Sequence, residues 1–206
     1  MRSTTNSRRW AFAAKRLFDI VVSFTLLVFL TPVWLLISSA VLLSSGWPII
    51  VRIERIGRGG KPFMVYKFRT MAKDAQLRKR EVYGSFNLDF RRLPDDPRIT
   101  SIGRKLRRCS IDELPQLWNV IKGDMTLVGP RPIDVAMALI DPKYNLNLKE
   151  MRPGMTGLAQ IYDHGNITLG QQSRLGGWYV RLWCLRLDLA ILFKTIPLIW
   201  RGHGAI

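Results

Sequence analysis

The sequence predicts a monotopic α+β membrane protein, and three observations support this fold class. A long apolar run, residues 17–43, is interrupted by Thr31-Pro32 near its middle and has basic residues on both sides. Two short stretches with strand character enclose a glycine-rich turn, and helical patterns follow toward the C-terminus. We therefore expect a membrane anchor over residues 1–46 and a small mixed domain with a short β-hairpin over residues 47–206.

The composition describes a folded, strongly basic chain. It has 206 residues, of which 48% are hydrophobic, enough for one domain with a real core. The 32 lysines and arginines outnumber 15 acids and give a net charge of +17, so the surface should attract nucleic acid, phosphorylated substrates or an anionic membrane. Cys109 and Cys184 are too few for a disulfide framework and indicate free thiols in a reducing compartment. With two histidines in the chain, a histidine-rich metal site is not expected.

The apolar run is long enough to cross a bilayer, which requires about 20 residues. Pro32 nevertheless removes a backbone donor from the middle of the run, which favours a kink or break there. Because both flanks are basic, the positive-inside rule favours keeping both on the cytoplasmic side. We therefore expect a re-entrant helix that enters and leaves one leaflet and is broken at Thr31-Pro32. A kinked single span stays open as the alternative, because proline is tolerated in spanning helices.

Strand patterns follow the anchor. Residues 49–53 and 63–69 are rich in β-branched and aromatic side chains, and a glycine-rich turn separates them. The period of two in the second strand places Lys67 and Arg69 on one face. Such cations are common on the wet face of a hairpin, but the same face is suited to holding a diphosphate. After the hairpin, residues 72–80 are expected to form an exposed, charged helix.

Two adjacent carboxylates, Asp112 and Glu113, precede an apolar helical pattern. One interpretation is structural, because Ser110 and Glu113 match a capping box and acids favour a first helical turn. The other is functional: an acid pair beside the free N–H groups of a helix start, preceded by arginines, suits phosphoryl chemistry. A second acid pair, Asp95-Asp96, lies between two prolines and is interpreted as turn chemistry.

Three segments supply further cations along the chain. A basic stretch that includes Arg107 leads directly into the acid pair. Arg131 follows in a stiff loop, Gly129-Pro130-Arg131-Pro132, where two prolines fix the backbone and present a guanidinium suited to bidentate phosphate binding. Arg152 lies in a turn rich in proline and glycine. If these arginines converge on the acid pair, together they form an anion site.

The C-terminal third mixes tryptophans, leucines and scattered charges over residues 178–200. The charges are too frequent for a membrane span, so we expect interfacial amphipathic helices that lie in the headgroup region. The alternative is an ordinary amphipathic helix that covers a soluble core.

Eight motifs occur in order along nearly the whole chain. They are Lys15-Arg16-Leu17-Phe18-Asp19, Thr31-Pro32, Tyr66-Lys67-Phe68-Arg69-Thr70-Met71, Asp96-Pro97-Arg98-Ile99-Thr100, Ser110-Ile111-Asp112-Glu113-Leu114-Pro115-Gln116, Gly123-Asp124-Met125, Gly129-Pro130-Arg131-Pro132 and Arg152-Pro153-Gly154-Met155-Thr156-Gly157. Any one of them is weak, but the ordered set is highly specific. It resembles the bacterial sugar transferase family, the monotopic phosphoglycosyl transferases that begin the assembly of membrane-bound glycans.

The resemblance implies that sugar-1-phosphate moves from a UDP-sugar to a polyprenyl phosphate, with release of UMP and a requirement for Mg²⁺. Asp112 matches the family's nucleophile, which forms a covalent phosphosugar intermediate, and we expect it to contact the metal. Glu113 completes the acid dyad. The cations expected to bind the substrates are Lys67, Arg69, Arg107, Arg131 and Arg152. The resemblance also implies a position on the cytoplasmic face of a bacterial inner membrane.

The sequence departs from the family pattern at three positions. Arg69 stands where some members have lysine, which preserves charge but alters donor geometry. Thr31 stands where serine more often precedes the proline, and Gly176 stands where many members carry an acid. The last change affects local C-terminal contacts and leaves the acid pair intact.

Other hypotheses remain beside the enzyme. The net charge alone also fits a membrane-tethered nucleic-acid-binding protein, but no recognition motif of that class is evident, so we expect no nucleic-acid partner. A scaffold that has lost catalysis would recruit assembly partners, and the intact acid pair argues against it. A multi-pass phosphoglycosyl transferase is not expected from a single apolar segment. The sequence leaves open the sugar, the glycan and the formation of a homo-oligomer.

Overall fold

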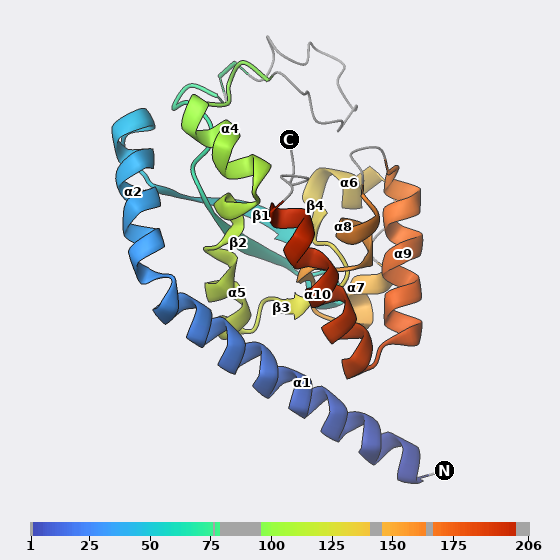
Figure 1. Ribbon diagram of the computed structural model, residues 1–206. Coiled ribbons are helices and arrows are strands. Elements are labelled where there is room, and N and C mark those ends of the chain that lie inside the picture. The colour runs from blue at the N-terminus through green and yellow to red at the C-terminus, as the bar shows by residue number, and fades with distance from the viewer. Residues whose placement is uncertain (1, 76, 79–95, 141–145, 164–166, 201–206) are drawn as a thin grey trace.

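A computed structural model of the chain describes residues 2–75, 77–78, 96–140, 146–163 and 167–200. The fold mixes helices with two small sheets, as predicted for an α+β protein. Figure 1 shows the sheets in the middle of the molecule, with helices arranged around them and a long bent helix pair along one side.

The bent pair consists of α1 (Arg2–Phe29) and α2 (Thr31–Ser45), which meet at an angle of 64°. Pro32 lies in the first turn of α2, and the Thr31 hydroxyl donates to the Leu27 carbonyl at 3.1 Å. The predicted break of the helix at Thr31-Pro32 is therefore confirmed. Within the described residues no single helix is long and apolar enough to cross a membrane, but these two helices together meet that requirement by length and composition.

The predicted hairpin is present. Strand β1 (Ile50–Ile56) pairs antiparallel with β2 (Pro62–Phe68), and the 3₁₀ turn η1 (Arg58–Gly60) joins them. Strand β4 (Ile133–Asp134) adds to the other edge of β1 at the end near this turn. The hairpin places Lys67 opposite Val51, at the end of the sheet away from β4.

The prediction of a charged helix over residues 72–80 is wrong for the part of that segment that the structure describes. Residues 73–75 and 77–78 form turns. The backbone instead pairs across the chain: the Ala72 N–H donates to the Arg98 carbonyl at 2.9 Å, and Met71 bridges Ile99. These long-range bonds use backbone groups that a helix would need for itself.

A second sheet was not predicted. It is formed by β3 (Thr126–Val128) and β5 (Gly154–Thr156), which run parallel. Three-residue strands are too short to show a clear period of two in the sequence. Gly154 is required at this point, because a Cβ there would lie only 2.1 Å from the Gly129 nitrogen.

Helices cover and connect the sheets. Their bounds are α4 (Ser101–Arg108), η2 (Ile111–Glu113), α5 (Gln116–Lys122), α6 (Val135–Ile140), α7 (Leu146–Glu150), α8 (Leu158–Tyr162), α9 (Leu169–Leu182) and α10 (Leu185–Trp200). The C-terminal helical prediction is confirmed by α9 and α10, and a Thr168–Gln171 capping box starts α9. The main core joins α5, β3 and the C-terminal helices through Leu117, Met125 and Tyr179, all nearly inaccessible.

A buried polar network attaches α1 to the rest of the fold. The Lys15 Nζ lies 2.7 Å from Asp188 on α10, and Asp19 accepts from the Thr126 hydroxyl on β3. The Tyr179 hydroxyl lies 2.7 Å from Asp188, and burial, together with the charge of Asp188, raises the pKa of this phenol above its ordinary value. We call Lys15, Asp19, Thr126, Tyr179 and Asp188 the α1 clamp, and each is at most 5% exposed.

The helices also expose large apolar side chains. On the bent pair, Phe29 is 78% exposed and Leu43 is 87% exposed, and on α10 Phe193 and Trp200 are similarly open. Such contiguous apolar surface is unusual on a protein that meets only water, and it indicates contact with a membrane or a partner.

Candidate active site

The acid pair lies in η2, a single 3₁₀ turn between α4 and α5. Ser110, just before it, has a left-handed backbone conformation with φ of 53° and makes no capping hydrogen bond through its side chain. The capping-box interpretation of Ser110 and Glu113 is therefore wrong. The acids also precede α5, which begins at Gln116, by a turn. A tight backbone reversal, not a helix start, presents these two carboxylates.

Lys67, the second-to-last residue of strand β2, faces the acid pair. Its Nζ lies 2.5 Å from Glu113 Oε1 and 3.9 Å from Asp112 Oδ2. The Asp112 side chain is 8% exposed, whereas those of Glu113 and Lys67 are about a quarter exposed. The lysine is therefore held by Glu113 and lies within electrostatic reach of the more deeply buried Asp112.

Arg107 approaches from α4 and completes the cationic surroundings. Its Nε donates to the Thr70 hydroxyl at 2.8 Å, just beyond the end of β2. Helix α4 is fixed there because Gly103 packs against the Thr70 carbonyl, where a Cβ would lie only 2.0 Å from the oxygen. The Thr100 side chain caps the same helix by accepting from the Gly103 N–H. The arginine is thus positioned by packing of backbone on backbone.

Burial raises the pKa of the Asp112 carboxyl above its ordinary value. The Lys67 ammonium and the Arg107 guanidinium oppose this effect, whereas the neighbouring Glu113 carboxylate adds to it. Asp112 is therefore a desolvated carboxylate between cations, an arrangement that recurs at active sites.

Asn119 is a positioning residue that no sequence pattern singles out. It is fully buried on α5, donates from Nδ2 to the Met64 carbonyl at 2.7 Å and accepts from the Tyr66 N–H at 3.1 Å. This cross-link fixes α5 against β2 and so fixes the acid pair relative to Lys67. No local pattern distinguishes an asparagine that binds a strand more than 50 residues away.

Asp96, the member of the second acid pair that the structure describes, has structural contacts, in line with its interpretation as turn chemistry. Asp96 is 2% exposed and accepts two bonds from Arg98 Nε, at 2.8 and 3.1 Å, and one from the Arg98 backbone N–H at 3.0 Å. Hydrogen bonds from Arg98 hold the pKa of Asp96 below its ordinary value. Asp95 lies outside the described residues. A carboxylate bonded to an arginine two residues away is explained by that contact alone.

The other predicted cations lie in three different surroundings. The Arg69 guanidinium donates to backbone carbonyls at the end of α2, including Ser45 at 2.6 Å and Trp47 at 3.1 Å. Arg152 Nε donates to the Gly123 carbonyl at 2.8 Å, past the C-terminal end of α5. These contacts give Arg69 and Arg152 structural partners of their own, separate from the acid pair.

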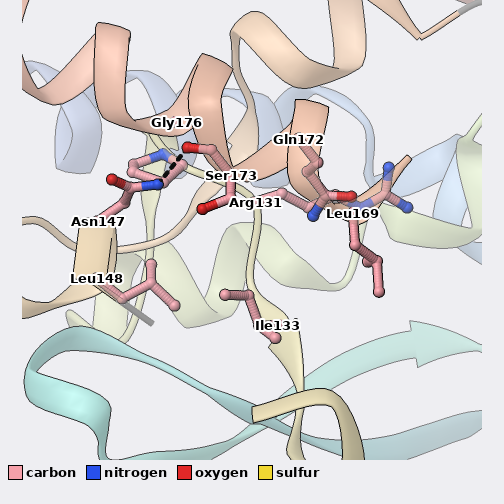
Figure 2. A pocket seen from close by; sticks show the side chains of 9 residues that line it. Arg131, Ile133, Asn147, Leu148, Leu169, Gln172, Ser173 and Gly176 are labelled. Atoms are coloured by element: carbon pink, nitrogen blue, oxygen red, sulfur yellow. Dashed lines mark hydrogen bonds between the residues drawn. The ribbon is translucent and has the colours of Figure 1, made fainter. Parts of the chain in front are cut away.

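Arg131 lines a narrow pocket between the loop before β4 and helices α7 and α9 (Figure 2). Its Nη1 lies 3.7 Å from Asp163, and Asn147 and Gln172 add polar groups to the same pocket. Gly176 lines the same pocket, and a Cβ at this position would lie only 2.9 Å from Asn147 Nδ2. The asparagine thus occupies the space that an acid at this position would need.

The donor set fits a magnesium ion only in part. Among the described residues no group of three or more histidine, cysteine or acidic side chains lies close enough to hold a metal. Asp112 and Glu113 nevertheless provide two carboxylates, and Mg²⁺ is usually bound by one or two carboxylates together with substrate phosphates and water. The residues present therefore fit a magnesium ion that arrives with a phosphate ligand.

The fold and the site together define the class of protein. It is an α+β protein with an apolar bent helix pair, and its carboxylate pair, set among cations, is suited to phosphate-bearing ligands. The chain belongs to the bacterial sugar transferase family, whose profile, described as "Bacterial sugar transferase", matches residues 10–202. The resemblance read from the ordered motifs is confirmed. This membership does not favour the nucleic-acid-binding alternative.

Three relatives illustrate the similarity. The chain is 41% identical to the undecaprenyl-phosphate galactose phosphotransferase of Salmonella typhimurium, over 93% of this chain and 41% of that protein. It is 38% identical to the exopolysaccharide production protein ExoY of Sinorhizobium fredii, over 93% and 88% of the two chains. It is also 38% identical to the UDP-glucose:undecaprenyl-phosphate glucose-1-phosphate transferase of Klebsiella pneumoniae, over 88% and 39%. The chain thus spans about two fifths of two of these relatives and most of the third.

Proposed function

We propose that the protein transfers sugar-1-phosphate from a UDP-sugar to a polyprenyl phosphate and releases UMP. The observation that carries the proposal is Asp112, a buried carboxylate beside Glu113 with Lys67 and Arg107 around it. The names of the Salmonella and Klebsiella relatives, which describe sugar-phosphate transfer to undecaprenyl phosphate, support the same reaction.

The reaction divides into two displacements at one phosphorus atom. An Asp112 carboxylate oxygen attacks the sugar-bearing phosphorus of the UDP-sugar, and the bond from that phosphorus to the bridging oxygen breaks as UMP leaves. An oxygen of polyprenyl phosphate then attacks the aspartyl phosphosugar at the same phosphorus, and the Asp112 carboxylate is released. The product is a polyprenyl diphosphate sugar. A carboxylate nucleophile allows the two anionic substrates to react in turn.

The surrounding residues have separate tasks. Lys67 and Arg107 offset the negative charge that would repel a carboxylate from a diphosphate, and Arg131 offers a further guanidinium for phosphate. Glu113 holds Lys67 in place and would be the second oxygen donor to a bound metal. When bound through Asp112 and Glu113, Mg²⁺ would neutralise phosphate oxygens and orient them.

The helices support the proposed membrane position. The bent pair and the exposed apolar side chains of α10 support a re-entrant anchor on the cytoplasmic face of a bacterial inner membrane. If α1 enters the leaflet at a shallow angle, the bend of 64° turns α2 back toward the side from which α1 enters. This placement brings a water-soluble UDP-sugar and a membrane-bound polyprenyl phosphate to one site.

The test is UMP release by the membrane-embedded protein, measured across a panel of UDP-sugars with Mg²⁺ and undecaprenyl phosphate. Release with one or a few sugars identifies the donor, and Asp112→Asn should abolish it. Asp134→Asn is the matched control, because it removes a carboxylate whose partner, Arg55, lies away from the acid pair. Intact-mass measurement without acceptor should show one added sugar phosphate on the wild type and none on Asp112→Asn. Undiminished release by Asp112→Asn would refute the assignment.

A further inference from the structure

Three arginines from distant parts of the chain gather beyond the C-terminal end of α5. Arg16 on α1 donates from Nη1 to the Val120 carbonyl at 2.6 Å, and Arg152 donates from Nε to the Gly123 carbonyl at 2.8 Å. Arg58, in the hairpin turn, is near enough to act on Arg152 electrostatically. We call these three residues the arginine cluster.

The cluster carries more positive charge than its surroundings balance. Burial lowers the pKa of Arg152, and the Arg16 and Arg58 guanidiniums lower it further. Asp19 is the carboxylate that opposes this effect, but it is already committed to Lys15 and Thr126. In the part of the chain that the structure describes, no acid forms an ion pair with any of the three arginines.

Helix capping explains only part of this arrangement. The carbonyls at the end of α5 bind two nitrogens of Arg16 and one of Arg152, which accounts for those bonds. Across the described residues, the two terminal nitrogens of Arg152 make no hydrogen bond, and exposed Arg58 keeps its full set of donors. Two guanidinium groups with unused donors on adjacent segments suit the oxygens of a phosphate.

The position of the cluster indicates which phosphate it meets. Arg16 directly precedes Leu17, which begins the long apolar run of the sequence and is itself 64% exposed. The cluster therefore lies at headgroup level if the anchor inserts. It is also separated from Asp112 by the whole of α5, whose seven residues span roughly 10 Å. A phosphate bound here is thus distinct from the one that reacts at Asp112.

We infer that the arginine cluster is a second phosphate site, which binds the headgroup phosphate of an anionic phospholipid. The inference rests on the proposed membrane association but is independent of the transfer reaction. Such a lipid would offset part of the cluster's positive charge and connect α1, the hairpin turn and the segment before β5 through one bridging anion. It would make the anchor's attachment to the domain sensitive to lipid composition.

The test measures lipid binding by the full chain in neutral detergent, without donor sugar. Native mass spectrometry would compare short-chain phosphatidylglycerol with phosphatidylcholine of the same chain length. The wild type should retain one phosphatidylglycerol in preference to phosphatidylcholine, and Arg58→Glu should weaken its binding by about tenfold or more. Lys61→Glu is the matched control: it makes the same charge change three residues away, at a lysine that does not act on Arg152. It should change binding by no more than about twofold.

Arg152→Gln should weaken phosphatidylglycerol binding as well, and Arg58→Glu keeps the test decisive if that half-buried substitution impairs folding. Equal retention of the two lipids would overturn the proposal, as would equal losses in Arg58→Glu and Lys61→Glu. Displacement of the bound lipid by millimolar inorganic phosphate would overturn the lipid assignment in favour of a soluble anion. Because no UDP-sugar is present, failure here is distinguishable from failure of the proposed reaction.

Discussion

The acid pair and the α1 clamp both bury a carboxylate near a lysine, yet they are built differently. In the clamp, Asp188 has Lys15 Nζ at 2.7 Å, the Tyr179 hydroxyl at 2.7 Å and Trp183 Nε1 at 3.2 Å. At the acid pair, Lys67 Nζ is 3.9 Å from Asp112 and only 2.5 Å from Glu113. One carboxylate is surrounded by donors, and the other is buried with its cation at a distance.

The difference separates a charge that holds the fold from a charge that is available for chemistry. A buried ion pair with satisfied hydrogen bonds resists disruption, because removal of one partner leaves the other charge unpaired in a poor solvent. A buried carboxylate whose pKa is raised is held in a less stable environment, which is a common property of reactive groups. Substitutions at the two sites should therefore have opposite consequences for activity and stability.

The largest effect is expected from Asp112→Asn compared with Asp188→Asn. Loss of the nucleophile should reduce kcat by about a thousandfold or more with little change in folding. Asp188→Asn should reduce activity only in proportion to the folded protein that remains. UMP release per folded molecule distinguishes the two. Equal specific activities of these variants would remove the contrast between the two sites.

The clamp should dominate stability. Asp188→Ala leaves Lys15 buried without its closest partner and should lower the free energy of unfolding by about 3–5 kcal/mol. Asp134→Asn breaks a pair whose side chains are about a third exposed and should cost at most about 1 kcal/mol. Denaturant unfolding in detergent measures both. The double variant Lys15→Met/Asp188→Leu should recover much of the loss, and failure to recover would argue against an unpaired charge as the cause.

Both sites also show which features a sequence can reveal. The hairpin, the break at Pro32 and the acid pair depend on neighbouring residues, so their patterns were readable. The clamp joins residues 15 and 188, and the Asn119 cross-link joins α5 to β2; neither leaves a local trace. Arg69 shows the same limit, because its period-two position with Lys67 did not reveal that its guanidinium binds the end of α2. Charge type was predictable, but the partner of each charge was not.

Lys67→Met tests whether the lysine acts on Asp112 at the acid pair. The lysine lowers the pKa of Asp112, so its removal should raise that pKa further and shift the acid limb of the kcat/KM profile toward higher pH. We also expect turnover to fall by about 10- to 100-fold, because one phosphate-facing cation is lost. Lys61→Met, in the turn of the same hairpin, is the control and should leave the pH profile unchanged. A lower turnover without a shift in the limb would mean that Lys67 does not act on Asp112.

The smallest expected effect is on the pH dependence of stability. A carboxyl whose pKa is raised in the folded state binds its proton more tightly there than in the unfolded chain. Its contribution to stability is present in acid and is lost as the pH rises through the folded-state pKa. Asp112→Asn should therefore match the wild type in acid and unfold a few degrees higher at neutral pH. Thermal unfolding at several pH values measures the difference in unfolding temperature between Asp112→Asn and the wild type. A difference that becomes smaller toward neutral pH would contradict the assigned burial of Asp112.

The α1 clamp also has a consequence for the timing of synthesis. Lys15 and Asp188 are separated by 173 positions, and a chain elongates at about 5–20 residues per second, so α1 is complete roughly 10–35 s before its partner exists. During that interval Asp19, one helical turn away and 3.7 Å from Lys15 in the finished fold, is the acid within reach. In the nascent anchor, Lys15 can therefore pair with Asp19 until α10 has been synthesised. The anchor is thus locked onto the domain only after translation has passed Asp188.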